Sequence, residues 1–235
     1  MAMAPAQKST AQERSMTTLR HQYLAQMGIP VWLARKTEVV SAAEAESPAP
    51  VSWEELAARV AACTLCDLHR ERTNTVFGVG QRDAALMVIG EAPGADEDRQ
   101  GEPFVGRAGQ LLNAMLWAIG FAREQVYIAN ILKCRPPNNR DPKPEEASAC
   151  SAYLDQQIRL IQPRVMLAVG RIAAQWLLQS DMAIGRLRGR VLRHGGSGIP
   201  LVATYHPAYL LRSPLAKAKS WQDLCMVKEL IVTKQ

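Results

Sequence analysis

Four of the five cysteines have the spacing of ligands for a metal centre. Cys63 and Cys66 form a CxxC pair, Cys134 follows after 67 intervening residues, and Cys150 follows after another 15. A CxxC pair lets two thiolates converge on one centre from a single turn of chain. Four thiolates suit either Zn²⁺ or a cubane cluster; a zinc ribbon usually has a second CxxC, so the wide later spacings favour [4Fe–4S]. The alternative is four unrelated buried cysteines, and the fifth, Cys225, is expected in the core of the last helix.

A segment rich in glycine and carboxylates, GEAPGADEDRQGEPFVGRAG, spans Gly90–Gly109 directly after an apolar run. Its five glycines and two prolines predict a loop, not a helix or central strand, in which the backbone approaches a ligand closely. The phosphate-binding pattern GxGxxG is absent, and carboxylates repel phosphate. We therefore expect a general base, a water-orienting group or a group that stabilises a developing cation. The carboxylates are Glu91, Asp96, Glu97, Asp98 and Glu102.

Three further residues could recognise a flat ring. Phe104, one of three phenylalanines, lies among the carboxylates and either stacks on a ligand or anchors the loop in the core. Asn130 lies inside an apolar run, and a buried amide left unpaired costs roughly 1–3 kcal/mol. Its partner is either neighbouring backbone or the edge of a nucleobase. His206 follows the last apolar run and is either a hydrogen-bond donor or acid, or a structural residue.

Alternating strands and helices must position these residues. Nearly continuous apolar runs predict four buried parallel strands, at Ala84–Gly90, Val126–Leu132, Val165–Gly170 and Leu201–Tyr205. Helices are predicted at Arg107–Ile119, Pro144–Ile161, Arg171–Leu178 and about 215–232. This order predicts an α/β fold, a three-layer α/β/α sandwich with a four-stranded, mainly parallel sheet. Ligands of such folds bind at the carboxyl ends of the strands, where Gly90, Asn130 and His206 are expected.

The chain is predicted to consist of an N-terminal extension, residues 1–51, and a domain over residues 52–235. Residues 40–51, VSAAEAESPAPV, have the composition of a flexible linker. Residues 17–33 carry apolar side chains at helical spacing, which predicts a short helix or a weakly docking tail. Ser52 is a candidate N-cap with a glutamate three residues later, so the domain should begin with a helix.

Charge is distributed unevenly along the chain. The net charge is +6, and counting gives +1 for residues 1–50, −3 for 51–150 and +8 for 151–235. A basic C-terminal third favours a polyanionic partner such as nucleic acid over a merely basic protein. The segment RLRGRVLRHGG predicts a short basic hairpin that either contacts phosphates or forms a solvated edge. Its arginines are Arg186, Arg188, Arg190 and Arg193.

Several protein classes are disfavoured. No apolar run reaches the roughly 18 residues of a membrane span, and the N-terminus lacks the apolar core of a secretory signal. Five cysteines without such a signal argue against a disulfide framework. We therefore expect a cytoplasmic protein whose reduced cysteines are free to bind a cluster, acting as a monomer without a membrane partner.

Together these motifs resemble the family 4 uracil-DNA glycosylases, the iron–sulfur, thermostable-type branch of that superfamily. The matching stretches are Gly90–Leu112, Asn130–Pro142, His206–Arg212 and the four cysteines. The resemblance covers about residues 53–230. It implies an enzyme that flips uracil out of double- or single-stranded DNA and hydrolyses its N-glycosidic bond. The product would be an abasic site, in the first step of base excision repair.

The same resemblance implies roles for the candidate residues. A structural [4Fe–4S] cluster would be held by Cys63, Cys66, Cys134 and Cys150. The uracil pocket would comprise Gly90, Glu91, Ala92, Phe104, Asn130 and His206. Phe104 would stack on the base, Asn130 would read its edge, and His206 would hydrogen-bond uracil O2. Glu97 would act with Asn130 and His206 in catalysis, by positioning water or excluding the thymine methyl. Tyr209, Leu210 and Arg212 would contact DNA, with Leu210 as a wedge into the vacated base stack.

Two other functions are possible for these motifs, and the chain differs from a related glycosylase branch at one loop. A non-catalytic DNA-binding protein with a cluster is one alternative, although such a protein gains nothing from Glu91 and Glu97 beside DNA. A zinc-ribbon-like module is the other, and an iron–sulfur chromophore would exclude it. A related branch bonds covalently to the abasic sugar through a histidine on an extra basic loop. This chain has no histidine between His69 and His194 and lacks that insertion, so we expect turnover.

Overall fold

The computed structural model describes residues 23–24, 26–28 and 52–233. The chain divides into two units, Met1–Ala49 and Pro50–Gln235. Of the first unit, only a short helical piece around Tyr23–Met27 is described, in which Met27 N donates to Tyr23 O at 3.1 Å. The predicted linker and most of the predicted N-terminal helix lie outside the described residues.

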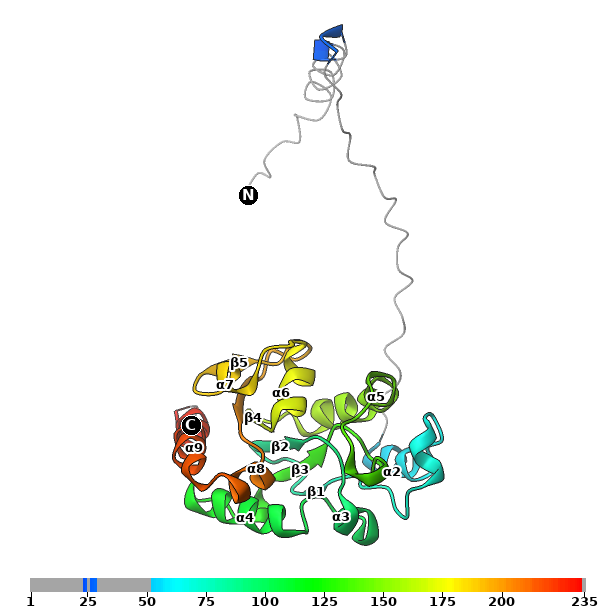
Figure 1. The fold of residues 1–235 in the computed structure, drawn as a ribbon, viewed down its shortest axis with the longest axis vertical. Coiled ribbons are helices and arrows are strands. Elements are labelled where there is room, and N and C mark those ends of the chain that lie inside the picture. Colours follow the sequence, from blue (N-terminus) through cyan, green and yellow to red (C-terminus); the bar gives the residue numbers. More distant parts are fainter. Residues whose placement is uncertain (1–22, 25, 29–51, 234–235) are drawn as a thin grey trace, which may run out of the picture. The chain divides into compact units, whose positions relative to one another are not determined.

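A six-stranded sheet in the order β1-β3-β2-β4-β6-β5 forms the centre of the second unit (Figure 1). The parallel strands are β2 (Leu86–Gly90), β3 (Tyr127–Asn130), β4 (Val165–Val169) and β6 (Pro200–Thr204). These are the four predicted strands, each buried along its whole length. Two short antiparallel strands form the edges: β1 (Val79–Gly80), which was not predicted, and β5 (Val191–Arg193), which lies in the segment predicted as a short hairpin or solvated edge. They are two and three residues long and partly exposed, so they leave no apolar run in the sequence.

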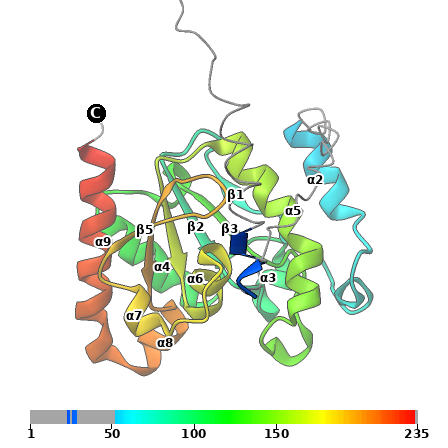
Figure 2. The same cartoon turned by 90° about the horizontal axis from the view of Figure 1, so that it is seen from above.

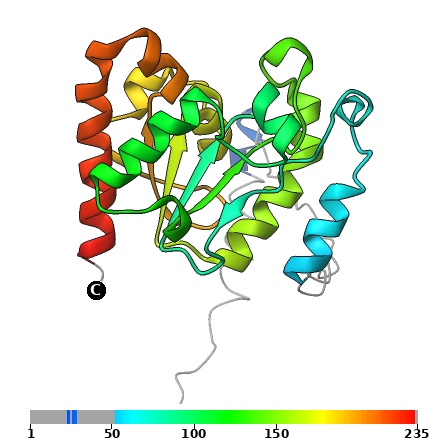
Figure 3. The same cartoon turned by 90° about the horizontal axis from the view of Figure 1, so that it is seen from below.

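Helices cover both faces of the sheet, as a three-layer sandwich requires. On one face, Met87 and Ile89 of β2 belong to a core shared with α5 (Pro144–Ile161) and α6 (Arg171–Leu178). On the other, Leu86 and Val88 pack in a core shared with α4 (Arg107–Ala118) and α9 (Lys217–Val232). The two-residue period of a strand sends these neighbours to opposite faces. Figures 2 and 3 show α2 (Trp53–Ala61) running beside α5 at one side of the sheet.

Most helix boundaries match the prediction. α5 and α6 have the predicted bounds, and α4 ends one residue early. α9 begins at Lys217 because Pro214–Ala216 forms a separate 3₁₀ turn, η4. The Ser52 hydroxyl accepts a hydrogen bond from Glu55 N at 3.1 Å, which confirms the predicted N-cap of α2. No described helix is long and apolar enough to cross a membrane.

Two predicted loops contain helices, which corrects the sequence interpretation. Within the glycine-rich segment, Ala95–Gln100 forms α3 between Gly94 at the N-cap and a left-handed Gly101 (φ 76°) at the C-cap. The glycines therefore end a helix on both sides, and the acidic residues of its first turn suit the helix dipole. After β6, Pro207–Arg212 forms α8, with His206 as N-cap and proline at the favoured first position. Figure 3 shows α8 (orange) at the end toward which the strand arrows point.

The remaining short elements connect these layers. They are η1 (Asp67–Arg70), η2 (Arg123–Gln125), η3 (Pro137–Asn139) and α7 (Ile184–Leu187). The segment predicted as a basic hairpin begins in α7, which contains Arg186, and continues into β5, which pairs with β6 outside the segment. Its Arg188 forms an ion pair with the buried Asp223 of α9 at 2.8 Å, so this arginine ties two elements together and is not free for phosphate.

Candidate active site and cysteine cavity

A cavity of about 620 Å³ opens at the carboxyl ends of the parallel strands. It brings together residues from the three segments that the sequence singled out. Most of the predicted site residues line it: Glu91, Ala92, Glu97, Phe104, Asn130, His206, Tyr209 and Arg212. Asn139 and Arg140, from the segment after Cys134, also line it. Asn139 turns its side-chain oxygen to Arg135 Nε at 2.7 Å.

Gly90 lies directly beneath this cavity and allows two side chains to meet there. It pairs in register with Asn130 across β2 and β3. A Cβ on Gly90 would lie 2.4 Å from Asn130 Oδ1 and 2.6 Å from Phe104 Cζ, closer than real Cβ atoms come. The amide and the ring therefore converge because residue 90 has no side chain.

Phe104 forms a wall of the cavity from a constrained position. Its φ of 54° is left-handed, and such a conformation in a non-glycine residue costs of order 1–3 kcal/mol. Arg123 fixes the turn by donating to Pro103 O at 2.5 Å and Phe104 O at 3.3 Å. Phe104 is 7% exposed and packs in the core, which confirms the interpretation as a loop anchor. It also lines the cavity, where stacking on a ligand stays a prediction.

Asn130 presents an unused acceptor to the cavity. The residue is 1% exposed, and Oδ1 has no hydrogen-bond partner among the described residues. The expected alternative, a bond from neighbouring backbone to this oxygen, is thus not found in the described part of the chain. Because a buried unpaired acceptor is costly, a donor from a water or a bound molecule would stabilise this oxygen.

His206 points a neutral imidazole at the same cavity. Its Nδ1 accepts from Ala208 N at 3.2 Å, which leaves the proton on Nε2. Burial lowers the pKa of His206 to about 4; Arg212 adds to the effect, and Glu97 opposes it. The ring centroid lies 5.8 Å from that of Phe104. At neutral pH His206 is a hydrogen-bond donor rather than an acid.

Most carboxylates of the glycine-rich segment bond to the protein itself. Fewer of them than predicted are therefore free to act as a general base or to orient water. Glu97 Oε2 accepts from Gly94 N at 3.1 Å, and Oε1 accepts from Val105 N and Gly106 N at 3.0 and 3.2 Å. Both oxygens are occupied, so Glu97 braces the loop around the cavity. Asp98 is buried and accepts from Thr73 N at 3.0 Å. Asp96 pairs with Arg99.

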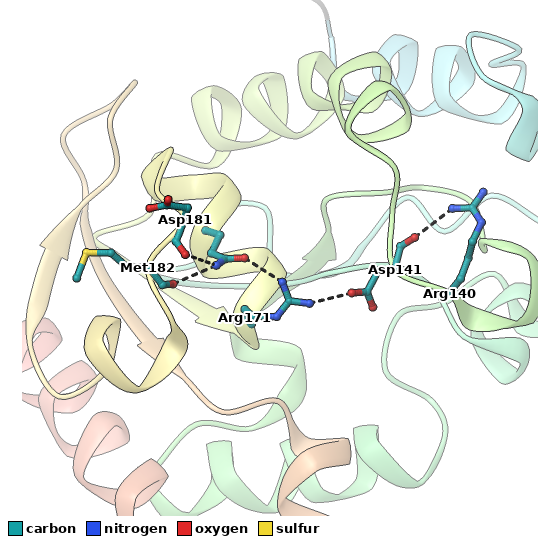
Figure 4. Close-up of polar contacts among 6 residues, drawn as sticks. Arg140, Asp141, Arg171, Asp181 and Met182 are labelled. Carbon is teal, nitrogen blue, oxygen red and sulfur yellow. Dashed lines mark hydrogen bonds and ion pairs between the residues drawn. The ribbon is translucent and has the colours of Figure 1, made fainter.

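Glu91 is the cavity carboxyl group whose pKa is most displaced. Burial raises the pKa of Glu91 to about 7; Asp141 adds to the rise and Arg171 opposes it. Figure 4 shows these two neighbours joined, with Arg171 Nη2 donating to Asp141 Oδ2 at 2.8 Å. This ion pair fastens the segment after Cys134 to α6, and within the segment Arg140 donates to Asp141 O at 3.1 Å.

Leu210 is wrong as the predicted wedge. It is 1% exposed and packs in the core shared with α4 and α9. The reason is that Pro207–Arg212 is helical, so successive side chains point in different directions. Its neighbours Tyr209 and Leu211 are 40% and 39% exposed, and Arg212 is exposed.

The four predicted cysteine ligands line a single second cavity. Cys63 and Cys66 follow α2, Cys134 follows β3, and Cys150 lies in α5. All four are free thiols. Cys225 lies apart, in α9, and is half-buried rather than fully in the core.

The surroundings of the thiols are cationic. Arg72 Nη1 donates to Cys134 Sγ at 3.1 Å, and Lys133 N donates to Cys150 Sγ at 3.3 Å. No carboxylate lines this cavity in the described part of the chain. Burial raises the pKa of Cys150 to about 11 and also raises the pKa of Cys134 and Cys66. Without metal these thiols keep their protons, and a metal centre would have to displace them.

Sequence reasoning missed two residues that build this region. Gly170 (φ 101°) lies against His206, whose Cβ would be 3.2 Å from a Cβ at residue 170. Lys133 is 1% exposed, and its Nζ donates to Asn130 O at 2.9 Å and to Gln157 Oε1 at 2.7 Å. The signal for Lys133 was a lysine set between a buried strand and a cysteine ligand.

Comparison with known proteins identifies the family. Residues 77–225 match the model of the uracil DNA glycosylase superfamily. A type-4 uracil-DNA glycosylase of Archaeoglobus fulgidus is 44% identical over 78% of this chain and 96% of its own length. One from Thermotoga maritima is 46% identical over 68% of this chain and 83% of its own. A type-5 uracil-DNA glycosylase of Thermus thermophilus is 33% identical over 56% of this chain. The chain therefore belongs to the type-4 uracil-DNA glycosylases.

Proposed function

We propose that this chain removes uracil from DNA by hydrolysing its N-glycosidic bond, which leaves an abasic site and begins base excision repair. The family supports the reaction, and the cavity at the strand ends supports the substrate. The single observation that carries the proposal is the buried, unpartnered Oδ1 of Asn130 beside Phe104 and the neutral His206. These three groups match a flat ring with a donor on its edge and a carbonyl next to it.

Uracil would be recognised outside the helix. Its N3–H would donate to Asn130 Oδ1, while the amide nitrogen would donate to O4 and the Phe104 ring would stack on the base. Asn130 and Phe104 are 1% and 7% exposed, so a base stacked inside a duplex cannot reach them. The nucleotide must therefore be flipped out, at a cost of a few kcal/mol.

His206 and Glu91 would then share the chemistry. As the bond between N1 and C1′ breaks, its electron pair goes to uracil, and His206 Nε2–H would donate to the developing anion at O2. A neutral imidazole suits this role because it stabilises the anion without protonating it first. Water adds to the cationic C1′, and the Glu91 carboxylate would orient that water and take its proton. Glu97 would keep the surrounding loop in shape.

DNA would be held by α8 and opened by Leu211. Leu211 is the exposed member of the leucine pair, and Arg212 beside it can contact a phosphate. Tyr209 lines the cavity at the same rim. One chain supplies every group in this account, so we take a monomer as the active unit. The segment after Cys134 carries no histidine, which supports turnover over covalent trapping.

We also propose that the cysteine cavity holds a [4Fe–4S] cluster. Four thiols line it, the Arg72 guanidinium donates to one of them and the backbone amide of Lys133 donates to another, which suits an assembly that is anionic with its thiolates. The bound cluster would crosslink α2, α5 and the end of β3 without entering the reaction. A reducing cytoplasm would keep these thiols available.

The test is uracil release by purified, iron-loaded protein. Oligonucleotides with one uracil, opposite guanine or single-stranded, are incubated with protein and cleaved with alkali; matched oligonucleotides with thymine serve as controls. We expect cleavage at uracil alone. No cleavage of either uracil substrate by protein with a full iron content would contradict the proposal and favour a non-catalytic DNA-binding protein.

A further inference from the structure

A buried lysine connects the cysteine cavity to the candidate base-reading residue. The backbone amide of Lys133 donates to Cys150 Sγ at 3.3 Å. Its Nζ donates to the carbonyl oxygen of Asn130 at 2.9 Å, at the last residue of β3. One residue thus touches a candidate cluster ligand with one end and the backbone of Asn130 with the other.

The second partner of Nζ is also held rigidly. Gln157 is fully buried, and its Oε1 accepts from Lys133 Nζ at 2.7 Å. Its Nε2 donates to Phe77 O at 2.9 Å and to Tyr127 OH at 3.0 Å, which fixes the orientation of the amide. Gln157 lies seven residues after Cys150 in α5, so both face the same side of that helix. Lys133 is therefore joined to α5 at two points and to β3 at one.

An ammonium group in this place needs a compensating charge. Lys133 is 1% exposed, and in the described part of the chain no carboxylate pairs with its Nζ. Burying a cation without a counter-charge is expensive. The hydrogen bonds to Asn130 O and Gln157 Oε1 are therefore what holds the Lys133 ammonium in this buried place.

We propose that Lys133 is a positioning residue that holds Asn130 in its base-reading place. The ammonium fixes the carbonyl of Asn130, so the peptide at the end of β3 cannot rotate. That peptide orientation sets where Oδ1 lies beneath the cavity. The inference rests on the proposed function, since it assigns Asn130 to uracil.

The experiment replaces Lys133 by methionine, which keeps the length of the side chain but removes the charge and the donors. Iron content and absorbance near 400 nm verify the cluster, and free-uracil affinity is measured by ligand-observed NMR. The affinity for uracil-free DNA and the single-turnover rate on uracil-containing DNA are measured on the same samples. Lys228→Met, at an exposed position of α9, is the matched control.

In iron-loaded Lys133→Met we expect uracil affinity and single-turnover rate each to fall about tenfold or more, because a hydrogen bond from a charged donor is lost. Affinity for uracil-free DNA should stay within about twofold of wild type, since Arg212 and Leu211 are untouched. Wild-type uracil affinity in this variant, or a parallel loss of DNA affinity, would overturn the proposal. If Lys133→Met cannot retain iron, the same uracil affinity is measured for iron-loaded Gln157→Leu, which removes the second partner of Lys133 Nζ. A tenfold loss of affinity in that variant supports the proposal, and wild-type affinity overturns it. A wild-type protein without glycosylase activity would instead refute the proposed function.

Discussion

Gly90→Ala is the sharpest perturbation that this site offers. The new Cβ would lie 2.4 Å from Asn130 Oδ1 and 2.6 Å from Phe104 Cζ, whereas ordinary contacts begin at 3.4 Å. The amide or the ring must therefore retreat by about 1 Å, and a misplacement of that size can cost about 100-fold in rate. The φ of Gly90 is not left-handed, so alanine adds no backbone strain. We expect a single-turnover rate on uracil-containing DNA at least about 100-fold below wild type.

The same substitution at Gly185 is the control, because a Cβ there meets nothing within 4 Å. Gly90→Ala should lose about 1–3 kcal/mol of unfolding free energy from overpacking. Gly185→Ala, inside α7, should match wild type in rate and be at least as stable. Iron content should be unchanged in both. A rate within about threefold of wild type for folded, iron-loaded Gly90→Ala would mean that Asn130 and Phe104 need not converge, and the reasoning would be refuted.

Four further perturbations test separate parts of the account. Cys150→Ala should bind less than half of the wild-type iron and lose absorbance near 400 nm; wild-type iron content would remove Cys150 from the ligand set. Leu211→Ala should slow uracil release from duplex DNA about tenfold or more but spare single-stranded substrate, whereas Leu210→Ala should lower the unfolding free energy by about 2–5 kcal/mol. The reverse pattern would restore Leu210 as the wedge. The single-turnover rate should rise with pH through about 7 as Glu91 ionises, and Glu91→Gln should be slow and flat over that range. The folded-state pKa of His206 is lowered to about 4, so the unfolded chain takes up a proton first as pH falls; stability should decline by about 3 kcal/mol between pH 6.5 and 4 relative to His206→Gln. Equal pH dependence in the two proteins would contradict this.

The central fold was predictable because each parallel strand is buried on both faces. Such strands appear in the sequence as continuous apolar runs, as Leu86–Gly90 and Val165–Val169 do. The edge strands Val79–Gly80 and Val191–Arg193 are too short and too exposed to leave that pattern. The helix Ala95–Gln100 was missed because glycine counts describe a segment as a whole, whereas Gly94 and Gly101 act as its two ends.

The site was predictable as a set of residues but not as a set of contacts. The sequence placed Glu97 and Leu210 near the substrate. Only the structure reveals that the Glu97 carboxylate accepts hydrogen bonds from backbone amides and that Leu210 packs in the core. The residue type determines which interactions a side chain can make. Its neighbours in the folded structure determine which of these interactions it does make. The role of Lys133 depends on Cys150 and Gln157, which are distant in sequence, so no local pattern could have disclosed it.

The central claim is that the unpartnered oxygen of Asn130 reads uracil, and one measurement tests it most directly. Release of free uracil from uracil-containing DNA under single-turnover conditions is quantified by mass spectrometry for iron-loaded wild type and Asn130→Ala. The account predicts uracil release by wild type and a rate at least about 100-fold lower for the variant, with iron content and DNA affinity unchanged. Equal rates in the two proteins, or no uracil release by wild type, would contradict it.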